Sequence, residues 1–365
     1  MKKLILGSLL MASLAAVSCG NKTTAPAEDA YPRTPSELRN YLAAVSDSGQ
    51  VLFGHHDDAV YGHTWVGDEG RSDVLETVGE YPAMMSWDLG GLEIGDSLSL
   101  DRVPFDRIRA EVARQAARGG VNTFSWHPVR AINGVSDSWN LTDTTIVARM
   151  TTDSLGIAEY RAQLRRLADF FNSLTDSTGA RIPVIFRPWH EHTGSWFWWG
   201  AKFATPDQYK ALWHILRDEF DSAGVDNVLY AYSPDRVTTP EQYLERYPGD
   251  EYVDIMGADV YHFNGAEGRD EYINVANTTL SIAGQVAKEH GKLLAFTETG
   301  LESLPIADWY TGTLLPILKN HPVSYVVVWR NAHDRPNHFY APYPGHPAVA
   351  DFKKFHDDPA TLFAK

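Results

Sequence analysis

The chain has 365 residues and a formal net charge of -15, with 44% hydrophobic and 22% charged residues. This composition is typical of a globular protein with a sizeable core. Because no block of lysine and arginine offers the surface that nucleic-acid binding needs, we expect no nucleic-acid partner. The single cysteine, Cys19, excludes an intramolecular disulfide and a thiolate metal cluster within one chain.

The first residues are typical of an export signal. Two lysines precede an apolar run that is too short to span a membrane, and small residues then lead to Cys19. The stretch Ala16-Val17-Ser18-Cys19 resembles a bacterial lipobox, although a cysteine placed there by chance is the alternative. We predict a lipoprotein signal peptide over residues 1–18, acylation of Cys19 and a flexible linker over residues 19–32.

This interpretation places the protein in a bacterial cell envelope, in contact with the membrane only through its lipid anchor. Residues 20–23 lack the acidic pair expected of surface-exported lipoproteins in the Bacteroidota. We therefore predict the periplasmic face, with the cell surface as the alternative.

Residues 33–365 form one predicted domain, because no low-complexity segment, repeat or long linker divides them. Short apolar runs alternate with amphipathic stretches, which predicts strands alternating with helices. The predicted strands are residues 51–53, 83–87, 121–126, 183–186, 228–232, 253–256, 293–296 and 324–329. The predicted helices are residues 105–118, 156–174, 206–220, 272–290 and 305–318, the third with Thr205 as its cap and Pro206 at its first position.

Eight strands alternating with helices predict an α/β fold, a single (β/α)8 barrel. A doubly wound open sheet is the competing architecture, but it ordinarily uses fewer strands and a glycine-rich phosphate turn that the chain lacks. In a barrel of this type, the active site lies at the carboxyl ends of the strands. The residues there are Gly54-His55-His56-Asp57-Asp58, Trp87-Asp88, Trp126-His127-Pro128, Arg187-Pro188-Trp189-His190-Glu191, Tyr232-Ser233-Pro234-Asp235, Asp259-Val260-Tyr261, Thr297-Glu298-Thr299-Gly300 and Trp329-Arg330-Asn331.

Two glutamates follow the fourth and seventh predicted strands, whose ends face each other across the mouth of a barrel. Hydrolysis of a glycosidic bond needs one carboxylic acid to protonate the leaving oxygen and a second carboxylate as nucleophile or base. Glu191 and Glu298 are placed for these roles. For either glutamate alone, a buried ion pair would be the simpler explanation.

We expect the surroundings of the two carboxyl groups to differ, which is how identical side chains take different roles. Hydrogen bonds from Tyr261 and Arg187 would hold Glu298 as a carboxylate nucleophile. Glu191 lies beside His190 and an aromatic loop, a less polar setting in which its proton is retained.

The stretch Trp196-Phe197-Trp198-Trp199 is the densest aromatic patch of the chain. Sugars present C–H faces that pack on indole rings, so we expect one or two of these rings to contact sugar, Trp196 above all. The alternative is that the rings cover the barrel without touching substrate.

The motif Arg187-Pro188-Trp189-His190-Glu191, together with Thr297-Glu298, Asp259-Val260-Tyr261 and Trp329-Arg330, resembles glycoside hydrolase family 26 over about residues 35–360. This family belongs to the large clan of retaining (β/α)8 hydrolases. Most members of that clan have asparagine before the acid glutamate, and His190 is the residue that points to family 26.

The resemblance implies a role for each matching position. It implies Glu191 as acid/base and Glu298 as nucleophile, with Tyr261 hydrogen-bonded to the nucleophile and Arg187 orienting the catalytic groups. The remaining substrate-binding positions that it implies are His127, His190, Trp196 and Trp329 around the sugar at the cleavage point, Arg330 at the next sugar outward and Asp259 near the leaving side.

The resemblance implies a retaining endo-β-1,4-mannanase that acts on mannan, galactomannan or manno-oligosaccharides, without a cofactor or a metal. A mixed-linkage β-glucanase and a β-1,3-xylanase are alternatives within the family. We expect β-mannan as the only partner and a monomeric protein.

Two interpretations of other classes compete. A metal-dependent hydrolase would use His55, His56, Asp57, His127, His190 and Asp259, but the adjacent pairs lack the alternating spacing that aims two ligands the same way from one strand. A carbohydrate-binding lipoprotein without activity is the second, and the presence of both glutamates argues against it.

Overall fold

The structure is a computed structural model that describes residues 31–128, 137–139 and 142–365. The predicted signal peptide, Cys19 and most of the predicted linker lie outside the described residues. Within the described ranges, no helix is both long enough and apolar enough to cross a membrane.

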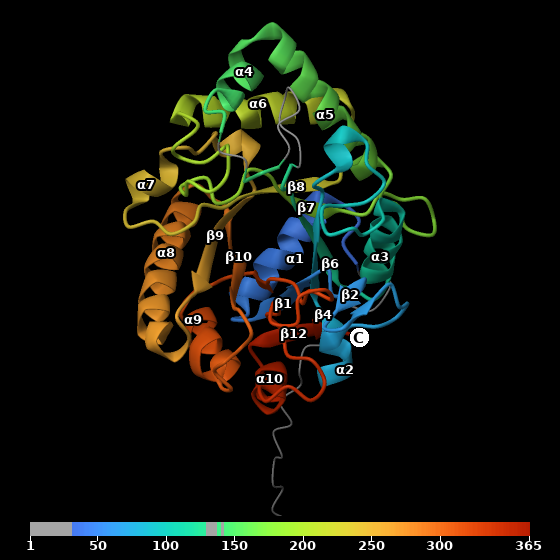
Figure 1. Ribbon diagram of the computed structural model, residues 1–365, viewed down its shortest axis with the longest axis vertical. Coiled ribbons are helices and arrows are strands. Elements are labelled where there is room, and N and C mark those ends of the chain that lie inside the picture. Colours follow the sequence, from blue (N-terminus) through green and yellow to red (C-terminus); the bar gives the residue numbers. More distant parts are fainter. Residues whose placement is uncertain (1–30, 129–136, 140–141) are drawn as a thin grey trace, which may run out of the picture.

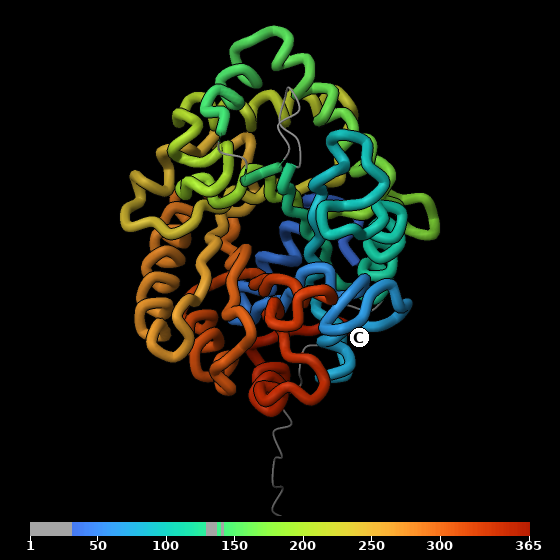
Figure 2. The backbone as a smooth tube through the Cα atoms, in the orientation of Figure 1, coloured from blue at the N-terminus to red at the C-terminus, as the bar shows by residue number. Residues whose placement is uncertain are grey.

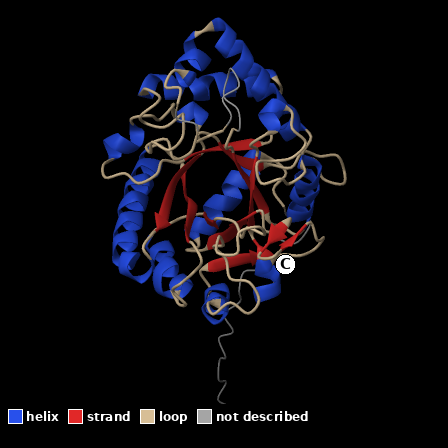
Figure 3. Ribbon diagram, viewed as in Figure 1, coloured by secondary structure: helices blue, strands red, loops and turns tan. Residues whose placement is uncertain are grey.

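Eight parallel strands close into a barrel, as predicted, because the last strand of the series pairs with the first. Figure 3 shows these strands as a ring surrounded by helices. Every predicted apolar run overlaps one barrel strand, and the strands extend further at their carboxyl ends than the apolar runs of residues 51–53, 253–256 and 293–296 do. The barrel strands are β1 (Val51–His56), β5 (Met84–Asp88), β6 (Val121–Ser125), β7 (Val184–Arg187), β8 (Val228–Tyr232), β9 (Ile255–His262), β10 (Leu293–Leu301) and β11 (Tyr325–Val328).

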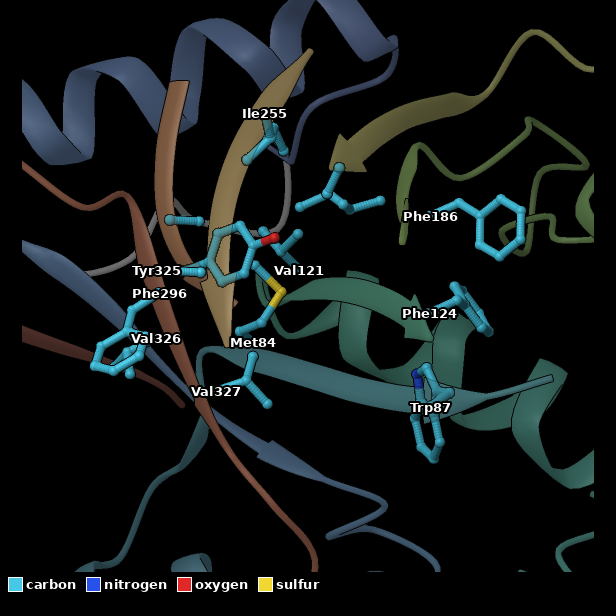
Figure 4. Packing of buried hydrophobic residues seen from close by; sticks show 14 of the residues in the cluster. Met84, Trp87, Val121, Phe124, Phe186, Ile255, Phe296, Tyr325, Val326 and Val327 are labelled. Atoms are coloured by element: carbon cyan, nitrogen blue, oxygen red, sulfur yellow. The ribbon is translucent and has the colours of Figure 1, made fainter. Parts of the chain in front are cut away.

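Alternate residues of each strand fill the inside of the barrel and the layer between strands and helices. Met84 and Tyr325 point into the barrel, whereas Phe124 and Phe186 point outward (Figure 4). Phe186 stacks on Phe220 of a surrounding helix with ring centroids 5.9 Å apart. Burying such a side chain stabilises the fold by about 1.5–3 kcal/mol. Because both faces are covered, strands such as β8 and β11 are continuous apolar or aromatic runs without polar alternation.

Helices surround the ring of strands (Figure 1). The helix beginning at Pro206 starts where the sequence predicts, since Thr205 and Gln208 form a reciprocal capping box. The α-helices are α1 (Pro35–Asp47), α2 (Asp73–Val78), α3 (Phe105–Ala117), α4 (Ile146–Thr152), α5 (Ser154–Asn172), α6 (Pro206–Ser222), α7 (Pro240–Leu244), α8 (Arg269–Glu289), α9 (Leu315–Asn320) and α10 (Val349–Asp357). Short 3-10 helices span Leu92–Ile94, Asp250–Tyr252 and Gly265–Gly268.

The helix predicted at residues 305–318 begins later and is irregular. A π-helical turn, Tyr310–Leu314, precedes α9. Ser303 and Leu304 have positive φ values of 63° and 41°, and residues 306–308 form a bend and a turn before the helix begins. Pro316 lacks the amide that a continuous α-helix would use at this point, which fits the wider turn before it.

The amino-terminal end of the barrel is covered by α1, which contacts β1, β8 and β10. The Tyr31 hydroxyl donates to the carbonyl of Pro183, directly before β7, at 3.1 Å. At the other terminus, β12 (Thr361–Ala364) pairs with β1 and with the antiparallel β4 (Tyr81–Pro82). Figure 2 shows this last segment beside the blue first strand. A small hairpin of β2 (Tyr61–Gly62) and β3 (Trp65–Val66) completes the strands of the described ranges.

Candidate active site

Glu298 lies inside β10, at a point where the regular alternation of that strand is broken. The pairing of β10 with β9 shifts by one residue between Ala295 and Glu298, which is a β-bulge. Thr297 hydrogen-bonds Asp259 and faces the inside of the barrel, whereas the Thr299 hydroxyl meets Tyr272 of α8 on the outside. The bulge therefore lets two consecutive residues, Thr297 and Glu298, both face inward.

Two donors hold the Glu298 carboxylate. The Tyr261 hydroxyl donates to Oε1 at 2.6 Å, and the Arg187 guanidinium forms an ion pair with Oε2. Both hydrogen bonds expected from the sequence are present. Arg187 and Glu298 are buried, Glu298 being 5% exposed, and Tyr261 is partly buried.

Arg187 connects two carboxylates on neighbouring strands. Its Nη2 contacts Glu298, and its Nη1 donates to Oδ2 of Asp259 at 2.8 Å. Asp259 also accepts hydrogen bonds from Ser233 and Thr297, each at 2.7 Å. Burial raises the pKa of Asp259 to about 7, and Arg187 opposes this rise.

Asp259 differs from its expected role. It has no exposed surface, and its two carboxylate oxygens are taken by Arg187, Ser233 and Thr297. Asp259 therefore supports the arginine behind the nucleophile, and the expected contact with the leaving side of a sugar chain is not available in this structure.

Glu191 sits on a strained turn directly after β7. Glu191 and Trp189 both have a φ of 53°, a left-handed conformation that is uncommon outside glycine. The Glu191 amide donates to the carbonyl of Ser233 at 2.8 Å, which holds this turn against the end of β8. The strain therefore coincides with a residue whose side chain reaches the mouth.

The Glu191 carboxyl group contrasts with that of Glu298. No arginine or lysine lies within 4 Å of it among the described residues, and Trp196 donates an indole hydrogen bond to Oε2 at 2.5 Å. Burial raises the pKa of Glu191 well above its ordinary value, with further contributions from the charges of Glu298 and Asp259. One carboxyl group is thus favoured as an acid, and the other is held by two donors.

His127, at the end of β6, contacts His190, which precedes Glu191. Their Nε2 atoms lie 3.1 Å apart. The Nδ1 atom of His127 lies 2.7 Å from Oδ2 of Asp88, at the end of β5. Burial and the charge of Arg187 lower the pKa of His190 well below its ordinary value, so this ring is neutral.

Aromatic rings lie beside Glu191, His56 and His127. Trp196 is 39% exposed, whereas Phe197, Trp198 and Trp199 are buried, so only the first ring of this loop is open to a ligand. Trp329 stacks on His56 with ring centroids 4.1 Å apart. Trp139, which is 52% exposed, stacks beside His127 with centroids 5.5 Å apart.

Comparison with known proteins agrees with this geometry. The model of glycosyl hydrolase family 26 matches residues 29–296. The chain belongs to glycoside hydrolase family 26. The (β/α)8 barrel expected of that family is the fold described above.

Solved family 26 structures are similar over most of this chain. A β-mannanase of Bacteroides ovatus is 47% identical, with a TM-score of 0.86, over 89% of this chain and 93% of that chain. The catalytic domain of a Bacillus sp. JAMB-750 endo-β-1,4-mannanase is 31% identical, with a TM-score of 0.79, over 94% and 95%. A mannan endo-1,4-β-mannosidase of Bifidobacterium adolescentis is 31% identical over 357 residues, which cover 90% of this chain and 35% of that protein. The chain thus spans about a third of that relative's length.

Arg330, expected at the next sugar outward in family 26, lies beside two acidic side chains. It forms an ion pair of 2.7 Å with Asp101, in the segment between β5 and α3. Potential ligand atoms of His56, Asp57 and Asp101 lie within 4.8 Å of one another. Among the described residues, these three form the group of side chains that could hold a cation. The six residues of the metal-hydrolase alternative do not form such a group there.

Sequence reasoning gave no role to Asp88, Asp101 and Trp139. Asp88 was recognisable as a strand-end residue, but its partner His127 is 39 positions away, and spacing does not reveal that contact. Asp101 and Trp139 lie in segments between strands, where neither strand pattern nor the family 26 motifs quoted above apply.

Proposed function

We propose that this family 26 hydrolase is a retaining endo-β-1,4-mannanase, with Glu191 as acid/base and Glu298 as nucleophile. The observation that carries the proposal is the contrast between two carboxyl groups at facing strand ends. Glu298 accepts from Tyr261 and Arg187, whereas Glu191 has a raised pKa and an indole donor as its partner. This is the division of roles that a double displacement needs.

In the first step, Glu191 protonates the glycosidic oxygen while Glu298 attacks the anomeric carbon and the leaving sugar departs. Arg187 and Tyr261 direct one Glu298 oxygen each, which leaves the carboxylate oriented for attack. In the second step, Glu191, now a carboxylate, takes a proton from water, and the water displaces Glu298. The exposed face of Trp196 supplies an apolar surface for a sugar ring beside the acid.

The substrate assignment is supported by the names of relatives. The Bacteroides ovatus, Bacillus and Bifidobacterium proteins are all described as mannanases or mannan endo-mannosidases. A relative of another name, endoglucanase H of Acetivibrio thermocellus, is 34% identical over 154 residues and 40% of this chain. Mixed-linkage β-glucan is therefore one alternative substrate, and β-1,3-xylan is the other alternative within the family.

The test compares wild type, Glu191→Ala and Glu298→Ala on mannan, galactomannan, mixed-linkage β-glucan and β-1,3-xylan. We expect wild type to release reducing ends from the two mannans, with oligosaccharides of several lengths early in the reaction. Proton NMR should show the β-anomer first. Faster cleavage of β-glucan or xylan would replace the substrate assignment, and α-anomer first would contradict retention. Binding of mannan without release of reducing ends would indicate a carbohydrate-binding lipoprotein.

We also propose that the protein is an acylated lipoprotein held at the periplasmic face of the cell envelope. The support is the segment Ala16-Val17-Ser18-Cys19 after a short apolar run, together with the absence of an acidic pair in residues 20–23. Labelling with a fatty-acid analogue should mark wild type and not Cys19→Ser. Protease treatment of intact cells should leave the protein uncut, and its digestion would place it on the cell surface.

A further inference from the structure

The carboxylate of Asp88 is buried at the end of β5, and its interactions are unusual for a buried charge. It is 1% exposed, and among the described residues no arginine or lysine lies within 4 Å of it. Instead, Oδ1 accepts from the amides of Gly90 at 2.7 Å and His127 at 3.3 Å. Oδ2 accepts from the Ser125 hydroxyl at 2.8 Å and contacts Nδ1 of His127 at 2.7 Å.

These contacts keep Asp88 negatively charged. Two backbone amides and the Ser125 hydroxyl donate to its oxygens, and hydrogen bonds to the charged form of a carboxyl group favour that form. A carboxylate only accepts hydrogen bonds. The Nδ1 atom of His127, 2.7 Å away, therefore carries a proton.

The buried Nδ1 atom of His190 decides the rest of the chain of contacts. This atom has no hydrogen-bond partner among the described residues, and an N–H group buried without an acceptor is costly, so the single proton of this neutral ring lies on Nε2. Nε2 of His190 lies 3.1 Å from Nε2 of His127 and donates to it. Nε2 of His127 therefore carries a lone pair, and the proton of His127 lies on Nδ1, against Asp88.

We infer that Asp88 is a positioning residue that fixes the tautomers of His127 and His190. It thereby determines which of the two Nε2 atoms beside the acid accepts a hydrogen bond and which one donates. With these tautomers, a sugar hydroxyl that takes the place of the hydrogen bond between the two Nε2 atoms meets one acceptor, on His127, and one donor, on His190. The neutral His190 then places no positive charge next to Glu191, where such a charge would favour loss of the acid's proton. This inference rests on the proposed function, because it concerns the same substrate site.

A purely structural role for Asp88 would be to join the ends of β5 and β6 through Gly90 and Ser125. The chain contains a matched control for this possibility. Asp58 contacts Nδ1 of His55 at 2.8 Å, and both side chains are fully buried in the same barrel. Asp58→Asn therefore removes the same kind of pair, and Ser125→Ala removes one donor to Asp88 while retaining its charge.

The first measurement is the tautomer of each ring by long-range ¹H–¹⁵N correlation spectra, with His127→Gln and His190→Gln used for assignment. In wild type we expect the proton of His127 on Nδ1 and that of His190 on Nε2. In Asp88→Asn the amide can donate to Nδ1 of His127, so both tautomers should reverse. Wild-type His127 with its neutral proton on Nε2 would overturn the inference, even if Asp88→Asn fails to fold.

The second measurement is kcat/KM on a manno-oligosaccharide, alongside thermal unfolding. Asp88→Asn should lose about 100-fold in kcat/KM, as expected when a group at the reacting centre is misplaced. Asp58→Asn and Ser125→Ala should stay within about threefold of wild type. An equal loss in Asp58→Asn, or unchanged tautomers in Asp88→Asn, would contradict the positioning role. If wild type cleaves no mannan, the proposed function fails, whereas the spectra still test Asp88.

Discussion

The indole of Trp196 donates a 2.5 Å hydrogen bond from Nε1 to Oε2 of Glu191, five residues earlier in the chain. The same ring is 39% exposed, so one residue both contacts the acid and presents an apolar face to the mouth. A hydrogen bond to the charged form of a carboxyl group lowers its pKa. Trp196 therefore limits the rise in the pKa of Glu191 that burial produces.

Trp196→Phe keeps an aromatic face and removes this hydrogen bond. The pKa of Glu191 should then rise further, and because the acid works in its protonated form, activity should extend to higher pH. The measurement is the alkaline limb of the profile of kcat/KM against pH. Trp198→Phe is the matched control, since its buried indole nitrogen has no hydrogen-bond partner among the described residues. A shift to lower pH, or the same shift in both variants, would contradict this assignment.

Glu191→Gln should change how stability depends on pH. The folded-state pKa of Glu191 is raised above its unfolded value, so ionisation destabilises the folded form as pH rises above the ordinary range of a glutamate. The glutamine variant lacks this loss, and its melting temperature should exceed that of wild type by an amount that grows with pH. Thermal unfolding at a series of pH values measures this difference in melting temperature, starting at about pH 4, the ordinary pKa of a glutamate, and ending at about pH 9. Exposed Glu267→Gln should follow wild type throughout.

Glu191→Ala should affect substrates according to their leaving group. Natural mannan needs a proton on the departing oxygen, so its cleavage should slow by about 100- to 10,000-fold. Aryl mannosides with activated leaving groups need no proton and should lose much less in the first step. Steady-state and burst kinetics on both substrate types check this. A loss independent of the leaving group would count against the acid role.

Arg187→Met should destabilise the fold strongly. Arg187 is buried between the Asp259 and Glu298 carboxylates, and removing one partner of a buried ion pair costs about 3–5 kcal/mol. Arg181→Met is a matched surface control, because its partner Asp226 is 76% exposed and such pairs contribute about 0–1 kcal/mol. Urea unfolding gives the free energy of unfolding of both variants. Similar losses of free energy in the two would show that the buried ion pair stabilises the fold no more than the surface pair does.

Gly257→Ala should disturb the hydrogen bonds that hold Asp259, the carboxylate that pairs with Arg187. A methyl group at this position in β9 would lie 2.5 Å from the Thr297 hydroxyl and 3.0 Å from Cβ of Ser233. Both side chains donate to Asp259. We expect a loss of about 1–3 kcal/mol from overpacking, with a lower kcat. Gly284→Ala, whose nearest neighbour is a Leu294 methyl group at 3.3 Å, should be close to neutral by the same two measurements.

The barrel and its two glutamates were predictable because their signals are local. Eight buried strands form apolar runs, and strand order alone places residues 191 and 298 on facing sides of the mouth. Side-chain direction inside a strand was less accessible. Alternation would turn Glu298 outward if Thr297 faces inward, and only the bulge in β10 brings both inside.

Long-range partners were also outside the reach of sequence patterns. Asp259 and Tyr261 share the inward face of β9, yet Tyr261 reaches the nucleophile and Asp259 is covered by Ser233 and Thr297. The chain before the delayed helix near residue 305 also turns through two positive φ values, at Ser303 and Leu304, and neither residue type signals that conformation.

The contact between Tyr31 and Pro183 has a consequence for orientation at a membrane. Tyr31 bonds to the residue before β7, and α1 then covers the amino-terminal end of the barrel. Glu191 and Glu298 lie at the opposite end. If Cys19 is acylated, as proposed, the lipid anchor is connected to the domain at the end of the barrel that α1 covers. The end with the two glutamates then faces away from the bilayer, where a soluble polysaccharide can reach it.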